Sequence, residues 1–352
     1  MKTVVRILVM LAASAAAVWF INRSAGTNTP AEAGARLVAS TQRSMGADAR
    51  LTAWTADEKA ARSAFDDAFR ELDRLESLMS TWRPGSDLVR LNEAAGKQPV
   101  RVSQEVFDAL RTARDFGDTT SGAFDVTFAA LADVWKFDHD QDNKVPSTAD
   151  IQRRLPLVGY KSLVLDTSAR TAYLTRAGMR AHLGGIGKGV AVDRVASLLR
   201  ERGLTSFMIQ FGGDMYLAGM PDTRRWRVGI QDPRGEGDKS FATMELTDSA
   251  ISTSGDYERF FLKDGVRYHH IIDTRTGQPA RGSRSVTIVA KTSSTADALS
   301  TGVFVMGPVA GMALIERLPD VEGVIVNDRN EVLVSSGLKG RLTIISKPTD
   351  SP

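Results

Sequence analysis

Two oxygen-bearing side chains, Asp297 and Thr301, stand four residues apart in the segment "TADALSTG" (295–302). On a helix this spacing places both side chains on one face. A carboxylate and a hydroxyl on one face suit a hard cation such as Mg²⁺, which takes few protein ligands beside water and substrate phosphates. The structural alternative is that Asp297 caps or solvates the helix start, while Thr301 bonds back to a backbone carbonyl.

A pair of histidines offers a second kind of chemistry. The chain has four histidines, and two of them, His269 and His270, are adjacent in "YHHIIDTRTG" (268–277). Neighbouring residues of a strand point to opposite faces, so at most one of the two is expected to face a site. Asp273 follows soon after His270, which suggests a general base with a supporting acid. The alternative for each histidine is a structural role.

A glycine-rich turn, "GGIGKG" (184–189), precedes an amphipathic stretch. Glycines let backbone N–H groups approach an anion, the start of the following helix favours negative charge, and Lys188 adds a full positive charge. The turn is not a P-loop, because Gly189 follows the lysine where that pattern needs Ser or Thr, and it does not match G-x-G-x-x-G. A plain strand-to-helix turn is an equally good interpretation.

Two further segments combine turn residues with polar side chains. "SGAFDVT" (121–127) places Asp125 after a Gly-Ala turn and an aromatic residue, where it either contacts a ligand or caps a helix. "STSGDYERFF" (252–261) carries consecutive hydroxyls before a glycine, which suits a phosphate site or a capped turn. Neither segment decides the function by itself.

The elements that must position these residues are helices and strands without strict alternation. Apolar residues at helical spacing predict a helix over 55–79, and Ser103 can cap a second helix that runs to about Gly117. Two more helices are predicted after the glycine turn, ending at Gly203, and over 294–307. Short apolar runs predict the strands 161–166, 171–176, 179–185, 206–213, 226–232, 285–290 and 323–328. The fold class is therefore mixed α/β or α+β in one large domain, at 36–346, with a tail at 347–352.

The N-terminal segment has the layout of an export signal. Lys2 and Arg6 precede an apolar run over 7–21, so residues 1–21 are a predicted signal peptide or short membrane anchor and 22–35 a linker. Either interpretation places the rest of the chain outside the cytoplasm, whereas the alternative is a buried N-terminal helix. The chain has no cysteine, which excludes disulfides, thiolate metal sites and a lipidated cysteine. A net charge of +3 without a basic stripe gives no support to nucleic-acid binding.

In combination, these motifs resemble those of the FAD:protein FMN transferases, the flavin transferase family called ApbE. The resemblance runs from about Ser44 to Ile345, and its segments occur in the family's order. They are "SMG" (44–46), "MSTWRPGSDLVRLN" (79–92), "SGAFDVT", "LGGIGKGVAVD" (183–193), "FGGDMYLAG" (211–219), "WRVGIQDP" (226–233), "ISTSGDYERFF" (251–261), "HHIIDTRTGQPA" (269–280) and "ADALSTG" (296–302).

The resemblance implies a mixed α/β flavin transferase domain and an exported enzyme that binds FAD and Mg²⁺. Such enzymes are commonly anchored at the bacterial inner membrane and face the periplasm. They transfer the FMN half of FAD through a phosphoester bond to a Thr, sometimes a Ser, of an acceptor protein, and AMP leaves. The acceptors are flavoproteins of membrane electron-transfer complexes, and the family's acceptor motif has the form Asp-x-x-Ser/Thr-Gly/Ser-Ala-Thr. Within this chain "DTTSGAF" (118–124) departs from that form at Phe124, so self-flavinylation is not expected.

The resemblance also assigns residues. Metal-shell positions match Gly185, through its carbonyl, and the side chains of Asp297 and Thr301, while the favoured base matches His270 rather than His269. Positions that contact the flavin nucleotide match Met45, Trp82, Ala123, Phe124, Asp125, His182, Lys188 and Asp273.

Some positions depart from the family's pattern. His182 stands where many members have Asp, and Thr274 replaces a proline. Two other functions stay open. One is a periplasmic FAD pyrophosphatase that releases FMN and AMP, and the other is a flavin-binding protein without turnover. Asp297, Thr301 and His270 argue against the second, because a storage protein needs no base.

Overall fold

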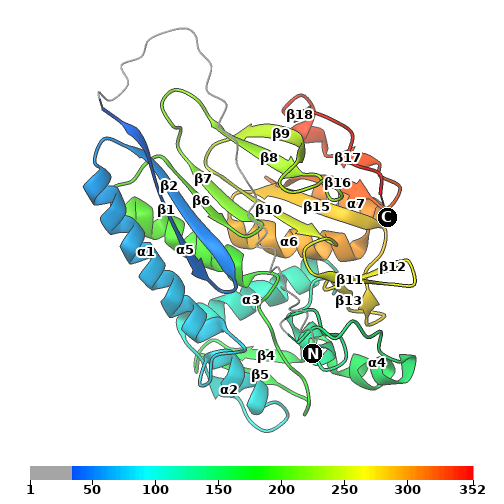
Figure 1. Cartoon of the computed structure of the whole chain (residues 1–352). Coiled ribbons are helices and arrows are strands. Elements are labelled where there is room, and N and C mark those ends of the chain that lie inside the picture. The colour runs from blue at the N-terminus through cyan, green and yellow to red at the C-terminus, as the bar shows by residue number, and fades with distance from the viewer. Residues whose placement is uncertain (1–33, 139, 352) are drawn as a thin grey trace, which may run out of the picture.

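An antiparallel sheet of eight strands forms the centre of the computed structural model, which describes residues 34–138 and 140–351 (Figure 1). Every neighbouring pair in it is antiparallel. In spatial order its strands are β1 (Arg36–Ser44), β2 (Ala47–Thr55), β6 (Phe207–Phe211), β7 (Asp214–Ala218), β10 (Ser249–Gly255), β15 (Ser283–Ala290), β16 (Glu322–Asn327) and β17 (Val332–Val334). With the surrounding helices this sheet confirms the predicted mixed fold.

Helices cover one face of the sheet (Figure 1). They are α1 (Glu58–Met79), α5 (Gly187–Glu201), α6 (Ser293–Met306) and α7 (Pro308–Ile315). The predicted helix over 55–79 is confirmed, and Asp57 caps it by accepting from the Ala60 N–H at 2.9 Å. Its buried residues follow the expected helical spacing, from Ala61 through Leu75 to Met79.

A three-stranded sheet packs beside the central sheet. It contains β8 (Trp226–Gln231), β9 (Ser240–Leu246) and β18 (Leu342–Ile344), and its apolar residues form a core with Leu217, Ile251 and Val324 of the central strands. Because the inner strands β6 and β7 are covered on both faces, all their residues are buried and neither shows alternation.

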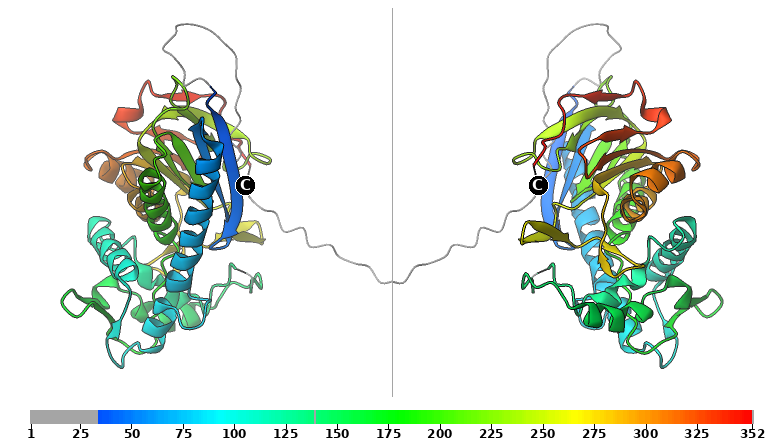
Figure 2. Two further views of the ribbon diagram at one scale, coloured as in Figure 1. Left: turned by 90° about the vertical axis from the view of Figure 1, so that its left-hand side faces the viewer. Right: turned by 90° about the vertical axis from the view of Figure 1, so that its right-hand side faces the viewer.

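The remaining elements lie at one end of the sheet, where both side views of Figure 2 show them beyond the strand ends. Apart from the 3₁₀ turn η4 (Ser336–Leu338), which contacts β16 of the central sheet, the helical ones are α2 (Asp87–Glu93), α3 (Gln104–Thr119), α4 (Thr148–Arg154) and the 3₁₀ turns η1 (Val126–Leu131), η2 (Leu155–Leu157) and η3 (Tyr160–Ser162). The strands are β3 (Val100–Arg101), β4 (Leu163–Asp166), β5 (Thr171–Leu174), the hairpin β11 (Phe260–Lys263) and β12 (Val266–His269), and the pair β13 (Ile272–Asp273) and β14 (Gln278–Pro279). Ser103 caps α3, as its sequence predicts.

One predicted strand is wrong. Residues 179–185 are extended or turn but belong to no strand. Ala181 bonds through both backbone groups to the side chain of Asn92, at 2.7 and 3.0 Å, and the His182 N–H donates to the Val126 carbonyl. The Asn92 side chain therefore makes the hydrogen bonds with Ala181 that a neighbouring strand would make.

The structure describes the C-terminal end of the chain but not its first 33 residues. The predicted signal or anchor at 1–21 and most of the linker at 22–35 lie outside the described residues. Within 34–138 and 140–351, no helix is long and apolar enough to cross a membrane. The tail that follows the predicted domain is tied down, because Thr349 donates to Asp232 through its N–H and its hydroxyl.

Candidate active site

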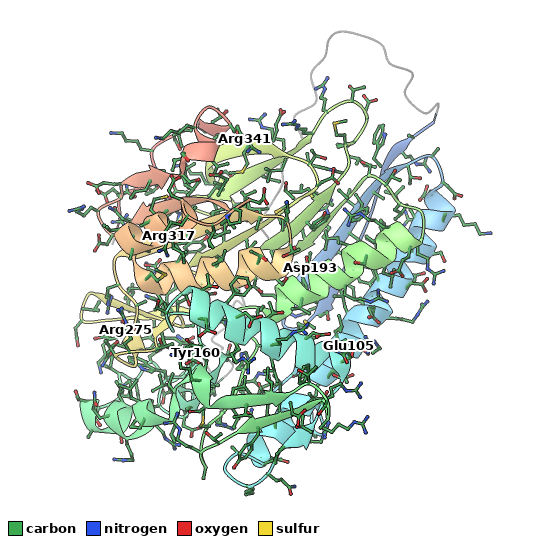
Figure 3. All side chains as sticks on the ribbon, turned by 180° about the vertical axis from the view of Figure 1, so that it is seen from behind. Glu105, Tyr160, Asp193, Arg275, Arg317 and Arg341 are labelled. Atoms are coloured by element: carbon green, nitrogen blue, oxygen red, sulfur yellow. The ribbon has the colours of Figure 1, made fainter. Side chains whose placement is uncertain are left out.

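The first turns of α5 and α6 hold each other in place. Asp193 of α5 accepts from the N–H groups of Ser293 and Ser294, at 2.7 and 2.9 Å, at the start of α6. In return, Asp297 of α6 accepts from the Gly189 N–H of α5 at 3.0 Å. Figure 3 labels Asp193 at the place where the two helices meet. The contact joins the glycine turn to the helix that carries Asp297 and Thr301.

Gly185 and Thr301, which the resemblance assigns to a metal shell, lie against each other at this junction. A Cβ added to Gly185 would lie 3.1 Å from the Thr301 hydroxyl oxygen, and equally close to the buried ring of Phe124. A side chain at residue 185 would therefore crowd the Thr301 hydroxyl and the Phe124 ring. Neither side chain fits the structural alternative fully, because Asp297 bonds to another helix and Thr301 contacts Ser254 of β10.

These oxygens fit Mg²⁺. Among the described residues, no three His, Cys, Asp or Glu side chains gather as a metal cluster. One carboxylate with a hydroxyl and a backbone carbonyl is the sparse, all-oxygen set that Mg²⁺ takes when substrate phosphates and water complete its shell. Asp297 is only 4% exposed, and burial together with the nearby Asp214 raises its pKa. A cation would relieve both effects.

Lys188 faces a second buried carboxylate. Its ammonium lies 2.5 Å from Asp214, which stands at the start of β7 and is 1% exposed. Burial opposes the charge of Lys188, but Asp214 and Asp297 together raise its pKa, so the side chain stays cationic. The Ser252 hydroxyl donates to the other oxygen of Asp214. A positive charge is therefore fixed beside the glycine turn, where an anionic substrate group would be stabilised.

The two adjacent histidines have different surroundings, and His270 lies just beyond the end of β12. His269 is buried, and its Nε2 donates to the Ala280 carbonyl at 2.9 Å while its Nδ1 accepts from the Ile271 N–H. Both of its ring nitrogens are therefore used in the fold. Burial lowers the pKa of His269 to about 4.

His270 has one nitrogen left for chemistry. Its Nδ1 lies 3.3 Å from the Arg259 carbonyl, which can only accept, so the proton is on Nδ1 and the lone pair on Nε2. Close packing around this half-buried ring lowers its pKa well below the usual value, and the charge of Arg259 lowers it further. The ring is therefore neutral near pH 7, as a general base must be.

The expectation that Asp273 supports His270 as an acid is wrong. Asp273 pairs with Arg275 at 3.1 Å, and the group that orients His270 is the backbone of Arg259. The turn after Asp273 does reach a predicted nucleotide segment, because the Thr274 hydroxyl donates to the Gly122 carbonyl at 2.7 Å.

His182 lies within the electrostatic reach of the same arginine. Its Nδ1 accepts from the Gly184 N–H at 2.8 Å, so its Nε2 carries the proton and can donate. Burial lowers the pKa of His182, followed by the charge of Arg259. A neutral donor therefore stands where the resemblance implies an acid.

The other predicted nucleotide contacts are spread around this centre. Met45 occupies the turn between β1 and β2 with a φ of +44°, and Trp82 is 62% exposed in the turn between α1 and α2. Ala123 and Phe124 are buried. The Asp125 carboxylate accepts from Thr127 and Tyr160 N–H groups, so it serves as the cap that the sequence left open. These assignments to nucleotide contact remain predictions.

Sequence reasoning missed several residues of this centre. Asp214 and the serines at 252, 254 and 300 form buried polar contacts around Lys188 and Thr301. Their segments belong to the motifs that carry the resemblance, but only the pairing of β7 with β10 and the packing of α6 against β10 bring these side chains together.

Known proteins match most of this chain in sequence and in structure. The model of the ApbE family matches residues 45–325. An FAD:protein FMN transferase of Treponema pallidum is 34% identical, with 80% of this chain and 82% of that protein covered. One from Klebsiella pneumoniae is 30% identical, covering 87% and 93%. The solved ApbE protein of Thermotoga maritima matches with a TM-score of 0.81 and 31% identity, covering 87% of this chain and 99% of that one. The flavin transferase ApbE of Vibrio cholerae gives 0.78 and 31%, with the same coverage.

Proposed function

The chain belongs to the ApbE family, and we propose that it is an Mg²⁺-dependent FAD:protein FMN transferase. It transfers the FMN moiety of FAD to a Thr or Ser hydroxyl of an acceptor flavoprotein, forming a phosphoester bond and releasing AMP. The observation that carries this proposal is the convergence of a neutral histidine, a half-buried lysine and an oxygen-rich pair around one glycine turn. Each has a role in phosphoryl transfer, which depends on positioning and charge stabilisation.

The diphosphate of FAD is the group that this centre suits. Bound Mg²⁺, held by Asp297, Thr301 and the Gly185 carbonyl, would polarise the phosphoryl oxygens. The ammonium of Lys188 lies on the adjoining turn, where it stabilises the charge that develops as the bridging P–O bond breaks. Asp214 keeps that ammonium in place and charged.

His270 acts on the acceptor. Its Nε2 takes the proton of the attacking hydroxyl as the oxygen bonds to the phosphorus of the FMN half, and the AMP half leaves with the bridging oxygen. Because the Nδ1 proton is held by the Arg259 carbonyl, the basic nitrogen has a fixed direction. His269 has no free nitrogen for this step.

We assign the flavin and adenosine parts of FAD to the other predicted contact residues. Trp82 offers an exposed ring for stacking, and Met45 lies at the adjoining β1–β2 turn. His182 can donate from Nε2. In the segment of Ala123, Phe124 and Asp125, the Phe124 ring packs against Gly185. Asp273, held by Arg275, shapes the far edge of the nucleotide site together with its turn.

We place the enzyme on the periplasmic side of a bacterial inner membrane, exported or anchored by residues 1–21. The positive charges before an apolar run support this proposal. The acceptors are flavoproteins of membrane electron-transfer complexes at the same membrane.

A second function, FAD pyrophosphatase, uses the same centre with water in place of the hydroxyl. One experiment separates the two. The protein is incubated with FAD, Mg²⁺ and an acceptor domain that carries the motif, and acceptor mass and free FMN are measured. FMN on the acceptor, absent without metal, supports transfer. Free FMN and AMP alone indicate hydrolysis, and bound FAD without any product indicates a flavin-binding protein.

A further inference from the structure

The hydroxyl of Thr301 is held by a chain of two serines, the half-buried Ser254 of β10 and the buried Ser300 of α6. We propose that Ser254 and Ser300 are positioning residues, which orient this hydroxyl so that its oxygen faces the cation. The inference rests on the proposed function for the identity of the cation. It concerns two residues to which the comparisons give no role, and of which the sequence places only Ser254 in a general phosphate-site or turn motif.

The chain consists of three contacts in sequence. The Thr301 and Ser254 hydroxyl oxygens are 3.2 Å apart, and those of Ser254 and Ser300 are 2.8 Å apart. The Ser300 hydroxyl in turn lies 2.9 Å from the backbone carbonyl of Asp297. Ser300 is fully buried, so water does not compete for its hydrogen bonds.

The last contact fixes the direction of all the others. A carbonyl can only accept, so Ser300 must donate its single proton to Asp297. Ser300 then accepts from Ser254, whose proton is thereby used. Ser254 can only accept from Thr301, and the Thr301 proton is therefore directed toward β10. The lone pairs of Thr301 are therefore not blocked by its own proton, and Gly185 packs close to the same oxygen, because an added Cβ would lie 3.1 Å from it.

A neighbouring serine does not belong to this chain. The Ser252 hydroxyl gives its proton to Asp214 and lies 3.4 Å from Ser300. Neither hydroxyl has a proton left for that contact, since Ser300 donates to Asp297. The Lys188–Asp214 pair and the Thr301 chain are therefore adjacent but separately oriented.

The chain has a chemical consequence. A hydroxyl binds a cation through its oxygen, so a proton pointing at the cation would oppose binding. Without Ser254, the Thr301 proton loses its acceptor and is free to rotate toward the metal side. Loss of one such hydrogen bond corresponds to about three- to tenfold in an equilibrium constant.

Metal binding is measured directly to test this inference. The full-length protein is titrated with Mg²⁺ and, separately, Mn²⁺ by calorimetry without FAD, and thermal unfolding is recorded for each variant without metal. We expect Ser254→Ala and Ser300→Ala to weaken metal binding about three- to tenfold, and Ser254→Thr, which keeps a hydroxyl, to restore it. The matched control is Thr253→Val, because Thr253 lies next along β10 but bonds to Thr287 of β15.

The outcomes separate the inference from the proposed function. Ser254→Ala and Ser300→Ala variants that fold normally and bind the metal as tightly as the wild type would overturn the inference. A wild type that binds no metal, or an equal loss in Thr253→Val, would overturn it as well. If the wild type binds metal but transfers no FMN, the proposed function fails while the serine chain is still tested by these affinities.

Discussion

Replacing Gly189 by alanine should separate the two helices that form the centre. An added Cβ would lie 2.4 Å from the Ser293 carbonyl oxygen and 2.8 Å from the Ser294 Cα, both backbone atoms that cannot rotate away. The start of α6 must therefore move by about 1 Å, since non-bonded contacts of this kind need more than 3 Å. That movement also breaks the bond from the Gly189 N–H to Asp297.

The magnitude follows from these two effects. Overpacking costs about 1–3 kcal/mol, and loss of a hydrogen bond to a charged group costs about 1.5–3 kcal/mol. Alanine regains about 1 kcal/mol through its better helix propensity. We expect Gly189→Ala to lower the free energy of unfolding by about 2–5 kcal/mol and the midpoint of thermal unfolding by roughly 3–8 °C. Metal affinity should fall about tenfold or more, because a supporting contact of Asp297 is lost.

Gly187→Ala is the matched control. It lies in the same turn of α5, but its Cβ would meet only the Leu183 side chain, at 3.3 Å. The control should unfold near the wild-type temperature, as followed by circular dichroism, and should bind metal normally by calorimetry. A Gly189→Ala protein that matches the wild type in both measurements would refute the reciprocal contact as the support of the centre.

Three further predictions concern the histidines and Trp82. Burial lowers the pKa of His269 to about 4, so below about pH 6.5 the unfolded chain binds more protons than the folded one, and up to about 3 kcal/mol of stability should be lost as the pH falls from there to 4. Denaturant titrations should show a smaller loss for His269→Gln. If the unfolding free energy of that variant has the same dependence on pH as the wild type, this prediction is wrong. Because the pKa of His270 is lowered well below its usual value in the free protein, the acidic limb of the kcat/KM profile should lie below about pH 6.5, and a limb above that value would exclude a neutral His270 as the base. Trp82→Ala should leave thermal stability within about 0.5 kcal/mol, because the ring is 62% exposed, but raise KM for FAD about three- to tenfold; an unchanged KM would remove Trp82 from the flavin site.

The sequence predicts those parts of the centre that depend on local spacing. Asp297 and Thr301 share a helix face because they are four residues apart, and His269 and His270 point apart because they are adjacent. Helix α3 begins after Ser103 because its hydroxyl caps the Val106 N–H. These features need only the geometry of a single element.

Features that need long-range contacts could not be predicted in this way. Asp214 reaches Lys188 only through the β6–β7 hairpin, and Ser254 meets Thr301 only because α6 packs on β10. The supporting group of His270 is a backbone carbonyl, which no residue type reveals. Likewise, the strand expected over 179–185 fails because Asn92, distant in the chain, supplies its hydrogen bonds.

The most direct test of the central claim is the mass of an acceptor domain after incubation with the protein, FAD and Mg²⁺. The proposed function predicts an increase equal to one FMN phosphoester for each modified hydroxyl, with one AMP released. The increase should be lost in His270→Ala but retained in His269→Gln, since of these two neighbouring histidines only His270 has a free ring nitrogen. An unmodified acceptor with accumulating free FMN and AMP, or a His270→Ala protein that still modifies the acceptor at the wild-type rate, would contradict it.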